Sequence, residues 1–494
     1  MNRIIKKTIC CLLAGAMCLS LSITAFAKPD WPSNTGILAE GGIIMDKDSG
    51  AVLFGQNIHL PYAPASITKL LTALVVVENS KLDEMVTFSD TAMNSVDPDS
   101  GNKQSLVTGD QLTVEDCLYL LLLQSSNQTA NALAEHVAGS IEGFVQMMND
   151  RMAQFGCTES HFANPSGLTD ENQYVSAYDM ALIAREAFSN ESLLTIDSAK
   201  SWKIGPTTNN PDGVTIRMEH RLINAEDPQS QYYCEGVIAG KTGYTLAAGN
   251  TLVTLAQRGD TSLISVILKG TQPQYYLDSK ELLEFGFANF TNWNISQNET
   301  DYVTGDGVTI GEEMYPASDL SLDEQAVITL PNGASFDDAD QTLVTDLAQD
   351  HPDGALALVE YTYNERKVGD AWLYSDTLLA KDTAVQETQS ETTTEAPTVE
   401  EKPVERGNLP DVLPIALGVL AVIAAAGGVA AFVLHVKHER ERERLARIQR
   451  RERRIQRLKE SGISMEEFES VRDRIAGEDR KRDKGDTTDD SEND

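Results

Sequence analysis

Ser66 and Lys69 have the residue types and the spacing of a nucleophile and its base. Pro64 favours an extended approach, and the apolar run over residues 67–77 predicts a buried helix whose first turn contains Ser66. Residues three apart share a helix face, so Lys69 is close enough to take the hydroxyl proton. Serine is a weak nucleophile at its ordinary pKa and needs such a neighbour. The alternative interpretation is an N-cap serine followed by a solvated lysine.

Two further short motifs follow in the chain. Ser125-x-Asn127 places a hydroxyl and an amide two residues apart, which suits a proton relay and a hydrogen-bonding clamp. On its own, the motif is more often a polar turn between two helices. Lys241-Thr242-Gly243 ends an apolar strand, where a lysine and a hydroxyl suit a carboxylate and glycine lets a ligand approach the backbone. Its alternative is a simple exit from a strand into a turn. Ser100-Gly101-Asn102-Lys103 repeats the serine–lysine spacing, but it lies in a Pro/Gly/Asp-rich loop.

The elements that must position these residues form an α+β pattern, with helices in the middle of the chain and strands towards both ends. Strands are expected at residues 41–46, 49–54, 212–224, 237–241, 251–256 and 263–268, the last two as an antiparallel pair. Helices are expected after Ser66 and at residues 114–124, 128–137, 144–155 and 177–188, while residues 86–110 look irregular. We therefore expect one sheet that is assembled from distant parts of the chain.

The ends of the chain carry targeting features. Residues 1–27 combine basic residues, an apolar stretch and Ala25-Phe26-Ala27, which is typical of a cleaved secretory signal. Residues 412–434 carry no charge and are long enough to cross a bilayer as a helix, and the arginine-rich segment after them indicates the cytoplasmic side. We therefore predict a single-pass cell-membrane protein with an extracellular folded part, a transmembrane helix at 411–436 and a cytoplasmic tail at 437–494. Small residues at 424/428 and 427/431 are compatible with a weak homodimer of the anchors.

Between these ends we expect two folded domains and a stalk. Residues 28–292 form the main domain, residues 293–378 a small all-β domain of short apolar runs, and residues 379–410 a Thr/Glu/Pro-rich disordered stalk. The formal net charge of −35 argues against nucleic acid as a partner. Cys117, Cys157 and Cys234 remain after signal removal, which permits at most one disulfide. The histidines lack metal-ligand spacing, so no metal and no cofactor are expected.

Taken together, the three motifs resemble those of penicillin-binding proteins and serine β-lactamases in type and in order. The segments Pro64-Ala65-Ser66-Ile67-Thr68-Lys69, Leu112-Thr113-Val114-Glu115-Asp116 and His161-Phe162-x-Asn164-Pro165-x-Gly167-Leu168 are similar to those of low-molecular-weight penicillin-binding proteins, the serine-type D-alanyl-D-alanine carboxypeptidases. The resemblance covers about residues 38–290 and implies the transpeptidase fold, an antiparallel sheet with a helical cluster, with residues 28–292 as the serine DD-peptidase catalytic domain.

The resemblance also implies residue roles and partners. Ser66 would attack a peptidoglycan stem peptide ending in D-Ala-D-Ala, with Lys69 as base and Ser125 as proton relay. Asn127 would hold the substrate amide, Lys241, Thr242 and Gly243 its carboxylate end, and the backbone N–H groups of Ser66 and Tyr244 the oxyanion. β-Lactam antibiotics would then be covalent inhibitors.

Two departures from the family pattern concern the site. Gln128 stands where many relatives have aspartate, and residues 270–277 lack the arginine that relatives often place near the carboxylate. The alternative functions are a serine β-lactamase, a DD-endopeptidase and a non-enzymatic, membrane-tethered wall-binding protein. A β-lactamase of class A would need an added glutamate for deacylation, and none is evident.

Overall fold

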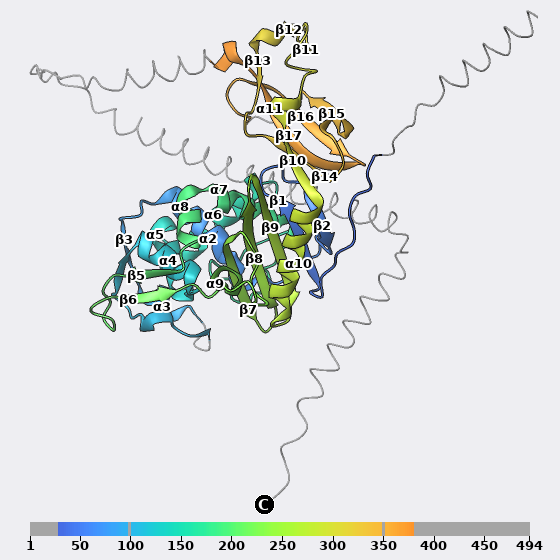
Figure 1. Ribbon diagram of the computed structural model, residues 1–494. Helices are drawn as coiled ribbons and strands as arrows, with labels where there is room; N and C mark the ends of the chain where they lie inside the picture. The colour runs from blue at the N-terminus through green and yellow to red at the C-terminus, as the bar shows by residue number, and fades with distance from the viewer. Residues whose placement is uncertain (1–27, 97–99, 348–350, 380–494) are drawn as a thin grey trace, which may run out of the picture. The chain divides into compact units, whose positions relative to one another are not determined.

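The computed structural model describes residues 28–96, 100–347 and 351–379 (Figure 1). The predicted signal peptide, transmembrane helix and cytoplasmic tail lie outside these ranges, as does the predicted stalk apart from Leu379. Among the residues that are described, no helix is both long and apolar enough to cross a bilayer. The membrane anchor therefore remains a prediction from the sequence.

A five-stranded antiparallel sheet is assembled from the two ends of the first 270 residues. Its strand order is β2-β1-β9-β8-β7, so β7 lies at one edge. The strands are β1 (Gly41–Asp46), β2 (Val52–Gln56), β7 (Val237–Thr245), β8 (Gly249–Arg258) and β9 (Thr261–Gly270). The predicted antiparallel pair is confirmed, with Leu252 opposite Ile267 across β8 and β9. The hairpin of β1 and β2 is confirmed as well.

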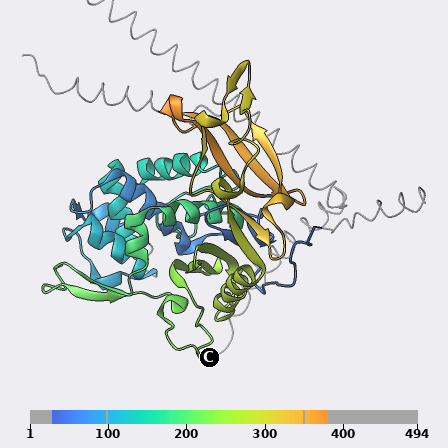
Figure 2. The same cartoon turned by 45° about the horizontal axis from the view of Figure 1, so that its top comes forward.

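The two faces of this sheet are covered by different helices, because successive side chains of a strand point to opposite sides. Ile43 and Val266 belong to a core shared with the helical cluster, whereas their neighbours Ile44 and Ile267 belong to a second core with α10 (Gln274–Asn289). Figures 1 and 2 show the helical cluster on one side of the sheet and α10 on the other. The sheet is therefore buried on both faces, and its apolar runs are explained by that burial.

The helical cluster contains the predicted helices with boundaries shifted by a few residues. Its members are α2 (Lys69–Asn79), α4 (Val114–Leu123), α5 (Asn127–Ala138), α6 (Ile141–Gln154), α7 (Ala177–Ser189) and α8 (Glu191–Asp197). Thr113, predicted as the N-cap of α4, accepts a hydrogen bond from the backbone N–H of Asp116 at 3.0 Å. Ser126 caps α5 in the same way through Thr129. Local capping thus fixes where the chain turns between α4 and α5.

Three expectations about secondary structure were wrong in part. The segment 212–224 is a strand only over β6 (Val214–Arg217), paired with β5 (Ser201–Ile204), and it ends in the helical turn α9 (Arg221–Asn224). The Asn224 side chain donates to the Met218 carbonyl at 2.7 Å and closes that turn. Helix α8 was not predicted. Residues 86–110 are also less irregular than expected, with the short elements β3 (Met85–Thr87), paired with β4 (Gln111–Thr113), α3 (Asp90–Asn94) and η3 (Lys103–Ser105).

After α10 the described chain is rich in strands. A four-stranded sheet has the order β13-β17-β16-β15. Two separate two-stranded sheets, β10–β14 and β11–β12, belong to the same part of the chain. The elements are β10 (Phe290–Asn294), α11 (Ile295–Asn298), β11 (Val308–Ile310), β12 (Glu313–Tyr315), η4 (Ala317–Asp319), β13 (Leu320–Leu322), β14 (Val327–Pro331), η5 (Phe336–Asp338), β15 (Asp340–Val344), β16 (Ala355–Tyr363) and β17 (Arg366–Ser375). Burial alternates along β16, and the buried side chains form a hydrophobic cluster of their own.

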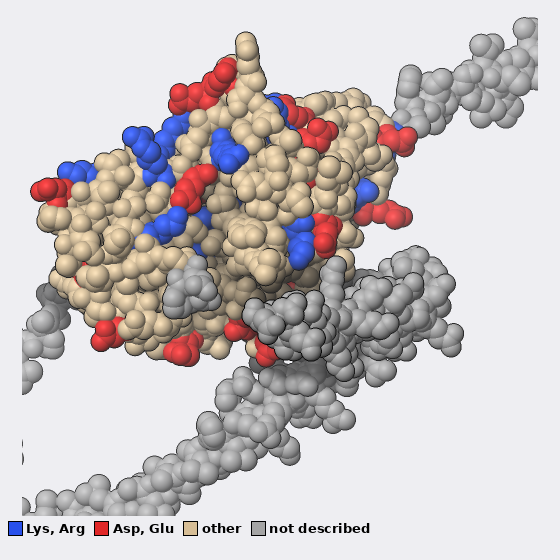
Figure 3. Space-filling model, turned by 90° about the horizontal axis from the view of Figure 1, so that it is seen from below, with Lys and Arg blue, Asp and Glu red and all other residues tan. Residues whose placement is uncertain are grey.

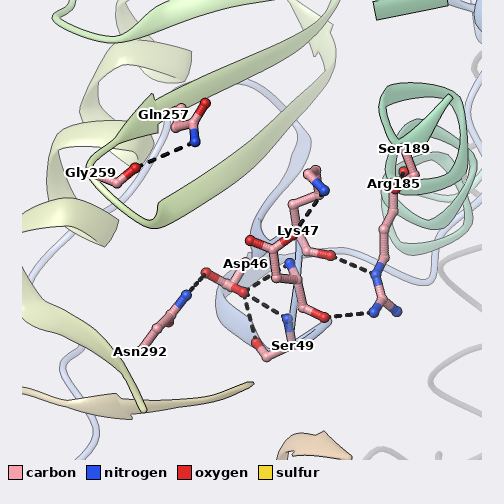
Figure 4. A network of polar contacts seen from close by, with 9 residues as sticks. Asp46, Lys47, Ser49, Arg185, Ser189, Gln257, Gly259 and Asn292 are labelled. Carbon is pink, nitrogen blue, oxygen red and sulfur yellow. Dashed lines mark hydrogen bonds and ion pairs between the residues drawn. The ribbon is translucent and has the colours of Figure 1, made fainter. Parts of the chain in front are cut away.

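The turn between β1 and β2 connects α7 with the strands that follow α10 (Figure 4). Arg185 of α7 donates to the Lys47 carbonyl at 2.6 Å and to the Asp48 carbonyl at 2.8 Å. Asp46 is fully buried and accepts a hydrogen bond from the Asn292 side chain of β10 at 2.9 Å. The turn therefore fixes three parts of the chain at one point.

Acidic and basic side chains are interspersed on the face that Figure 3 shows. The acidic excess of the sequence does not gather there into one continuous patch.

Candidate active site

Ser66 lies in a 3₁₀ turn, η1 (Ala65–Thr68), that runs directly into α2. Lys69 Nζ lies 3.0 Å from Ser66 Oγ and 2.8 Å from Asn127 Oδ1, and it also donates to the Ser166 carbonyl. Ala65 has φ near 50°, an unusual value for a residue with a side chain. Backbone strain of this kind is common next to reacting groups. The predicted nucleophile and base are thus within hydrogen-bond distance.

The Lys69 amine is completely buried. Burial lowers its pKa well below the ordinary value of 10.5, and the positive charges of Lys241 and Lys103 lower it further. All three of its contacts are with oxygen atoms, and the oxygens of Asn127 and Ser166 hold the amine in place beside the Ser66 hydroxyl. An amine with a lowered pKa is neutral over more of the physiological pH range and can accept a proton.

Ser125 lies in the connection between α4 and α5, at the C-terminal side of α4 as predicted. Its φ is near 61°, the left-handed region, which makes it the second strained position of the site. Asn127 begins α5 and directs its carbonyl oxygen to Lys69. The second motif therefore contacts the first through this amide.

The third motif lies on β7, the edge strand, beside the turn that carries Ser66. A Cβ at Gly243 would lie 2.8 Å from the Ser66 backbone nitrogen and 2.3 Å from Thr251 Oγ1, so only glycine permits this approach. Thr251 Oγ1 in turn donates to the Pro64 carbonyl at 2.8 Å. The strand end and the serine turn are thereby held together. Tyr244, next along the strand, is 64% exposed.

Lys241 is buried, and its Nζ donates to the Thr242 carbonyl at 2.8 Å. Burial lowers its pKa to about 8, while the negative charges of Glu219 and Asp197 act in the opposite direction. Lys241 is therefore mainly protonated at neutral pH and can bind a carboxylate there.

The loop of residues 164–168 packs against the serine turn from another side. Asn164 Oδ1 accepts from the backbone N–H groups of Ser166 at 3.2 Å and Gly167 at 2.8 Å. Gly167 has φ near 86°, and a Cβ there would lie 1.9 Å from the Ala65 carbonyl oxygen. The loop thus aims the Ser166 carbonyl at Lys69 and requires glycine next to Ser166.

Two buried polar residues lie behind Lys241 and were not singled out from the sequence. Asp197 Oδ2 accepts from the Gly240 N–H at 2.8 Å, and its Oδ1 receives no hydrogen bond from any described residue. His220 Nε2 lies 3.1 Å from Thr254 Oγ1. Burial raises the pKa of Asp197 to about 7 and lowers that of His220 to about 3. Asp197 ends α8, a helix that the sequence reading missed, which is why the carboxylate was not connected with the site.

Lys103 was set aside in the sequence as part of a chance serine–lysine spacing, yet its charge acts on both Lys69 and Lys241. No described group of three or more His, Cys, Asp or Glu residues is arranged to hold a metal ion. The cysteines Cys117, Cys157 and Cys234 are free and buried.

Comparison with known proteins places this geometry in a family. The family described as D-alanyl-D-alanine carboxypeptidase matches residues 28–272. The chain is 30% identical over 293 residues to the D-alanyl-D-alanine carboxypeptidase DacF of Bacillus subtilis, covering 58% of this chain and 72% of the relative. It is 32% identical over 332 residues to DacC of Escherichia coli, covering 65% and 79%.

Among solved structures, penicillin-binding protein 5 from Haemophilus influenzae superposes with a TM-score of 0.55 at 27% identity, covering 70% of this chain and 98% of that one. The antiparallel sheet with its helical cluster is thus the penicillin-binding-protein fold. The chain belongs to the D-alanyl-D-alanine carboxypeptidase family.

Proposed function

We propose that the chain is a serine D-Ala-D-Ala carboxypeptidase that removes the terminal D-alanine of peptidoglycan stem peptides through an acyl-enzyme on Ser66. The observation that carries this proposal is the buried Lys69 amine, 3.0 Å from Ser66 Oγ and with a lowered pKa. Family membership supports the reaction class, since the relatives bear the name D-alanyl-D-alanine carboxypeptidase.

In acylation, Ser66 Oγ bonds to the carbonyl carbon of the penultimate D-alanine while Lys69 Nζ takes the hydroxyl proton. The backbone N–H groups of Ser66 and Tyr244 stabilise the oxyanion, a contribution of about 3 kcal/mol per donor in well-studied hydrolases. The C–N bond then breaks, and Ser125 passes a proton to the departing amine of D-alanine. Water attacks the ester in the second half and regenerates the Ser66 hydroxyl.

The residues around Ser66 and Lys69 position the substrate. Asn127 holds the substrate amide while its oxygen keeps Lys69 oriented, a contact of 2.8 Å. Lys241 and Thr242 bind the terminal carboxylate, and Gly243 keeps β7 close to the serine turn. β-Lactams would acylate the same hydroxyl and act as covalent inhibitors.

Roles for the segments that flank the catalytic domain are also proposed from the sequence. Residues 1–27 direct export, residues 411–436 anchor the chain in the membrane with residues 437–494 in the cytoplasm, and residues 379–410 act as a stalk. A separate all-β domain at 293–378 is supported by its own sheets and its own hydrophobic cluster. A weak homodimer through the small residues of the anchor is tested by cross-linking in membranes.

The direct test is mass spectrometry of a synthetic pentapeptide ending in D-Ala-D-Ala after incubation with the full chain. Loss of one D-alanine by the wild type and none by Ser66→Ala is expected. Labelling by a fluorescent penicillin should disappear in the same variant. Unchanged peptide and no labelling of the wild type would instead favour the wall-binding alternative.

The remaining rivals differ in product. Fast release of hydrolysed penicillin would favour a β-lactamase, whereas a long-lived adduct on Ser66 supports the carboxypeptidase. Cleavage of a cross-linked dimeric peptide would show endopeptidase action at the same residues.

A further inference from the structure

The loop that carries Lys103 is attached to the segment that carries Ser125 and Asn127. Gln128, next to Asn127, donates through Nε2 to the Gly101 carbonyl at 3.0 Å. Gln104 donates through Nε2 to Gln124 Oε1 at 3.1 Å, and Gln124 immediately precedes Ser125. Gln128 thus fastens this loop to the start of α5.

The backbone of the loop is held in a strained conformation. Gln104 and Ser105 have φ near 59° and 53°, two consecutive left-handed residues with side chains. The side chain of Asn210 donates to the Gln104 carbonyl at 2.9 Å, and that of Asn209 donates to the Ser105 carbonyl at 2.7 Å. Such strain persists only where surrounding contacts impose it, and it is concentrated at functional segments.

Glu219, the partner of Lys103, is next in the sequence to a residue that packs against the strand of Lys241. It precedes His220, which is buried, and a Cβ at Gly240 would lie 3.1 Å from His220 Nε2. Gly240 in turn precedes Lys241. The Gln124 side chain also donates to the Arg217 carbonyl at 2.9 Å, so the two segments are bridged a second time nearby.

The ion pair between these segments is short and accessible. Lys103 Nζ lies 2.8 Å from Glu219 Oε1, and the two side chains are 41% and 43% exposed. The charges of both residues act on the pKa of Lys241, Lys103 lowering it and Glu219 raising it. Lys103 is an accessible cation on a loop that is hydrogen-bonded to the segment of Ser125 and Asn127, and it is already paired with a carboxylate. It can therefore exchange that carboxylate for one of the substrate.

We propose that Lys103 is a specificity-determining residue that binds a carboxylate of the peptide substrate, and that Glu219 competes with that carboxylate for the Lys103 ammonium. This electrostatic latch, Lys103 with Glu219, supplies a second cation in addition to Lys241. The inference rests on the proposed carboxypeptidase function. The bound carboxylate is either the terminal one or an acidic side chain of the stem peptide.

Three variants of the full chain test the latch: Lys103→Gln, Glu219→Gln and the double variant. At pH 7 and low salt, D-alanine release should show KM raised about two- to five-fold by Lys103→Gln and lowered about two-fold by Glu219→Gln, as for exposed ion pairs. The KM of the double variant should match that of Lys103→Gln, because Glu219 competes with the substrate carboxylate only for the Lys103 ammonium. These differences should shrink at about 1 M salt, where the screening length is about 3 Å.

The matched control is the exposed pair Lys200–Glu226, which lies on other segments of the same chain. Lys200→Gln and Glu226→Gln should leave KM unchanged. Two peptides locate the carboxylate, one with an acidic and one with an amidated side chain before D-Ala-D-Ala. A KM effect on both peptides assigns the terminal carboxylate, and an effect on the acidic peptide alone assigns the side chain.

Opposite signs for the two single variants would support the latch, since a merely structural ion pair would change KM in the same direction when either side is removed. Equal KM values for the wild type and all three variants would overturn it. If the wild type releases no D-alanine, the proposed function itself fails, which is a different result.

Discussion

Asp46 and Asp197 are both completely buried carboxylates, and they differ in how they are hydrogen-bonded. Asp46 Oδ1 accepts from the Asp48 N–H at 3.0 Å, the Ser49 N–H at 2.8 Å and the Ser49 hydroxyl at 3.0 Å, and Oδ2 accepts from Asn292 (Figure 4). Asp197 Oδ2 accepts a hydrogen bond from the Gly240 N–H at 2.8 Å, and Asp197 Oδ1 receives none from any described residue.

The difference separates Asp46, which has a structural role, from Asp197, which affects the protonation of Lys241. Both carboxylate oxygens of Asp46 accept hydrogen bonds, from the turn that follows it and from Asn292 of β10. The residue therefore holds these chain segments together and has no unpaired oxygen that could take part in a reaction. Asp197 is left under-bonded beside Lys241, where its charge acts on the lysine. A buried polar group that is not fully hydrogen-bonded costs free energy, and it is retained most readily where a reaction uses it.

The largest effect is expected from Lys69→Met, which removes the amine beside Ser66 with little change in volume. The kcat/KM for D-alanine release should fall about 10²- to 10⁴-fold, the usual contribution of a general base. The melting temperature should change little, because burying an apolar group in place of an amine offsets the hydrogen bonds that Asn127 and Ser166 lose. A parallel loss of activity and of thermal stability would contradict the assignment, since Lys69 would then be structural.

Asp46→Ala should show the reverse pattern. The free energy of unfolding in urea should fall by about 1–3 kcal/mol, because the Ser49 N–H stays buried without its acceptor. Below the unfolding transition, kcat/KM should be that of the wild type. Asp48→Ala, which removes a partly exposed carboxylate paired with Lys47, is the control and should change stability by less.

Asp197→Asn should have a smaller effect that depends on pH. The negative charge of Asp197 raises the pKa of Lys241, so its removal should lower that pKa below about 8. Lys241 is then deprotonated at a lower pH, and the alkaline fall of kcat/KM should begin earlier. Asp46→Ala should leave this fall in place. An unshifted profile in Asp197→Asn would remove the distinction between the two acids.

The sequence sufficed for the parts of the site that are encoded locally. The serine turn, the helix end at Ser125 and the strand at Lys241 each follow from capping, periodicity and turn residues within about ten positions. The β8–β9 pair was predicted for the same reason.

The remainder depends on contacts between distant segments. The loop that carries Lys103 is held by hydrogen bonds to the side chains of residues 124, 128, 209 and 210, none of which is near it in the sequence. Asp197 is the last residue of α8, and the N-cap Asn190 could have predicted where that helix begins. Gly167 and Gly243 belong to motifs that are recognisable in the sequence. The close backbone contacts with the serine turn that require glycine at these positions are visible only in the structure.

The most direct test of the central claim, that a buried neutral Lys69 activates Ser66, is the pH profile of kcat/KM for D-alanine release. Because burial lowers the pKa of Lys69 well below 10.5, activity should already be established at neutral pH, and it should fall near pH 8 as Lys241 loses its proton. Activity that instead keeps rising towards pH 10, with a midpoint at the ordinary lysine value, would show that Lys69 is protonated at neutral pH and would contradict the claim.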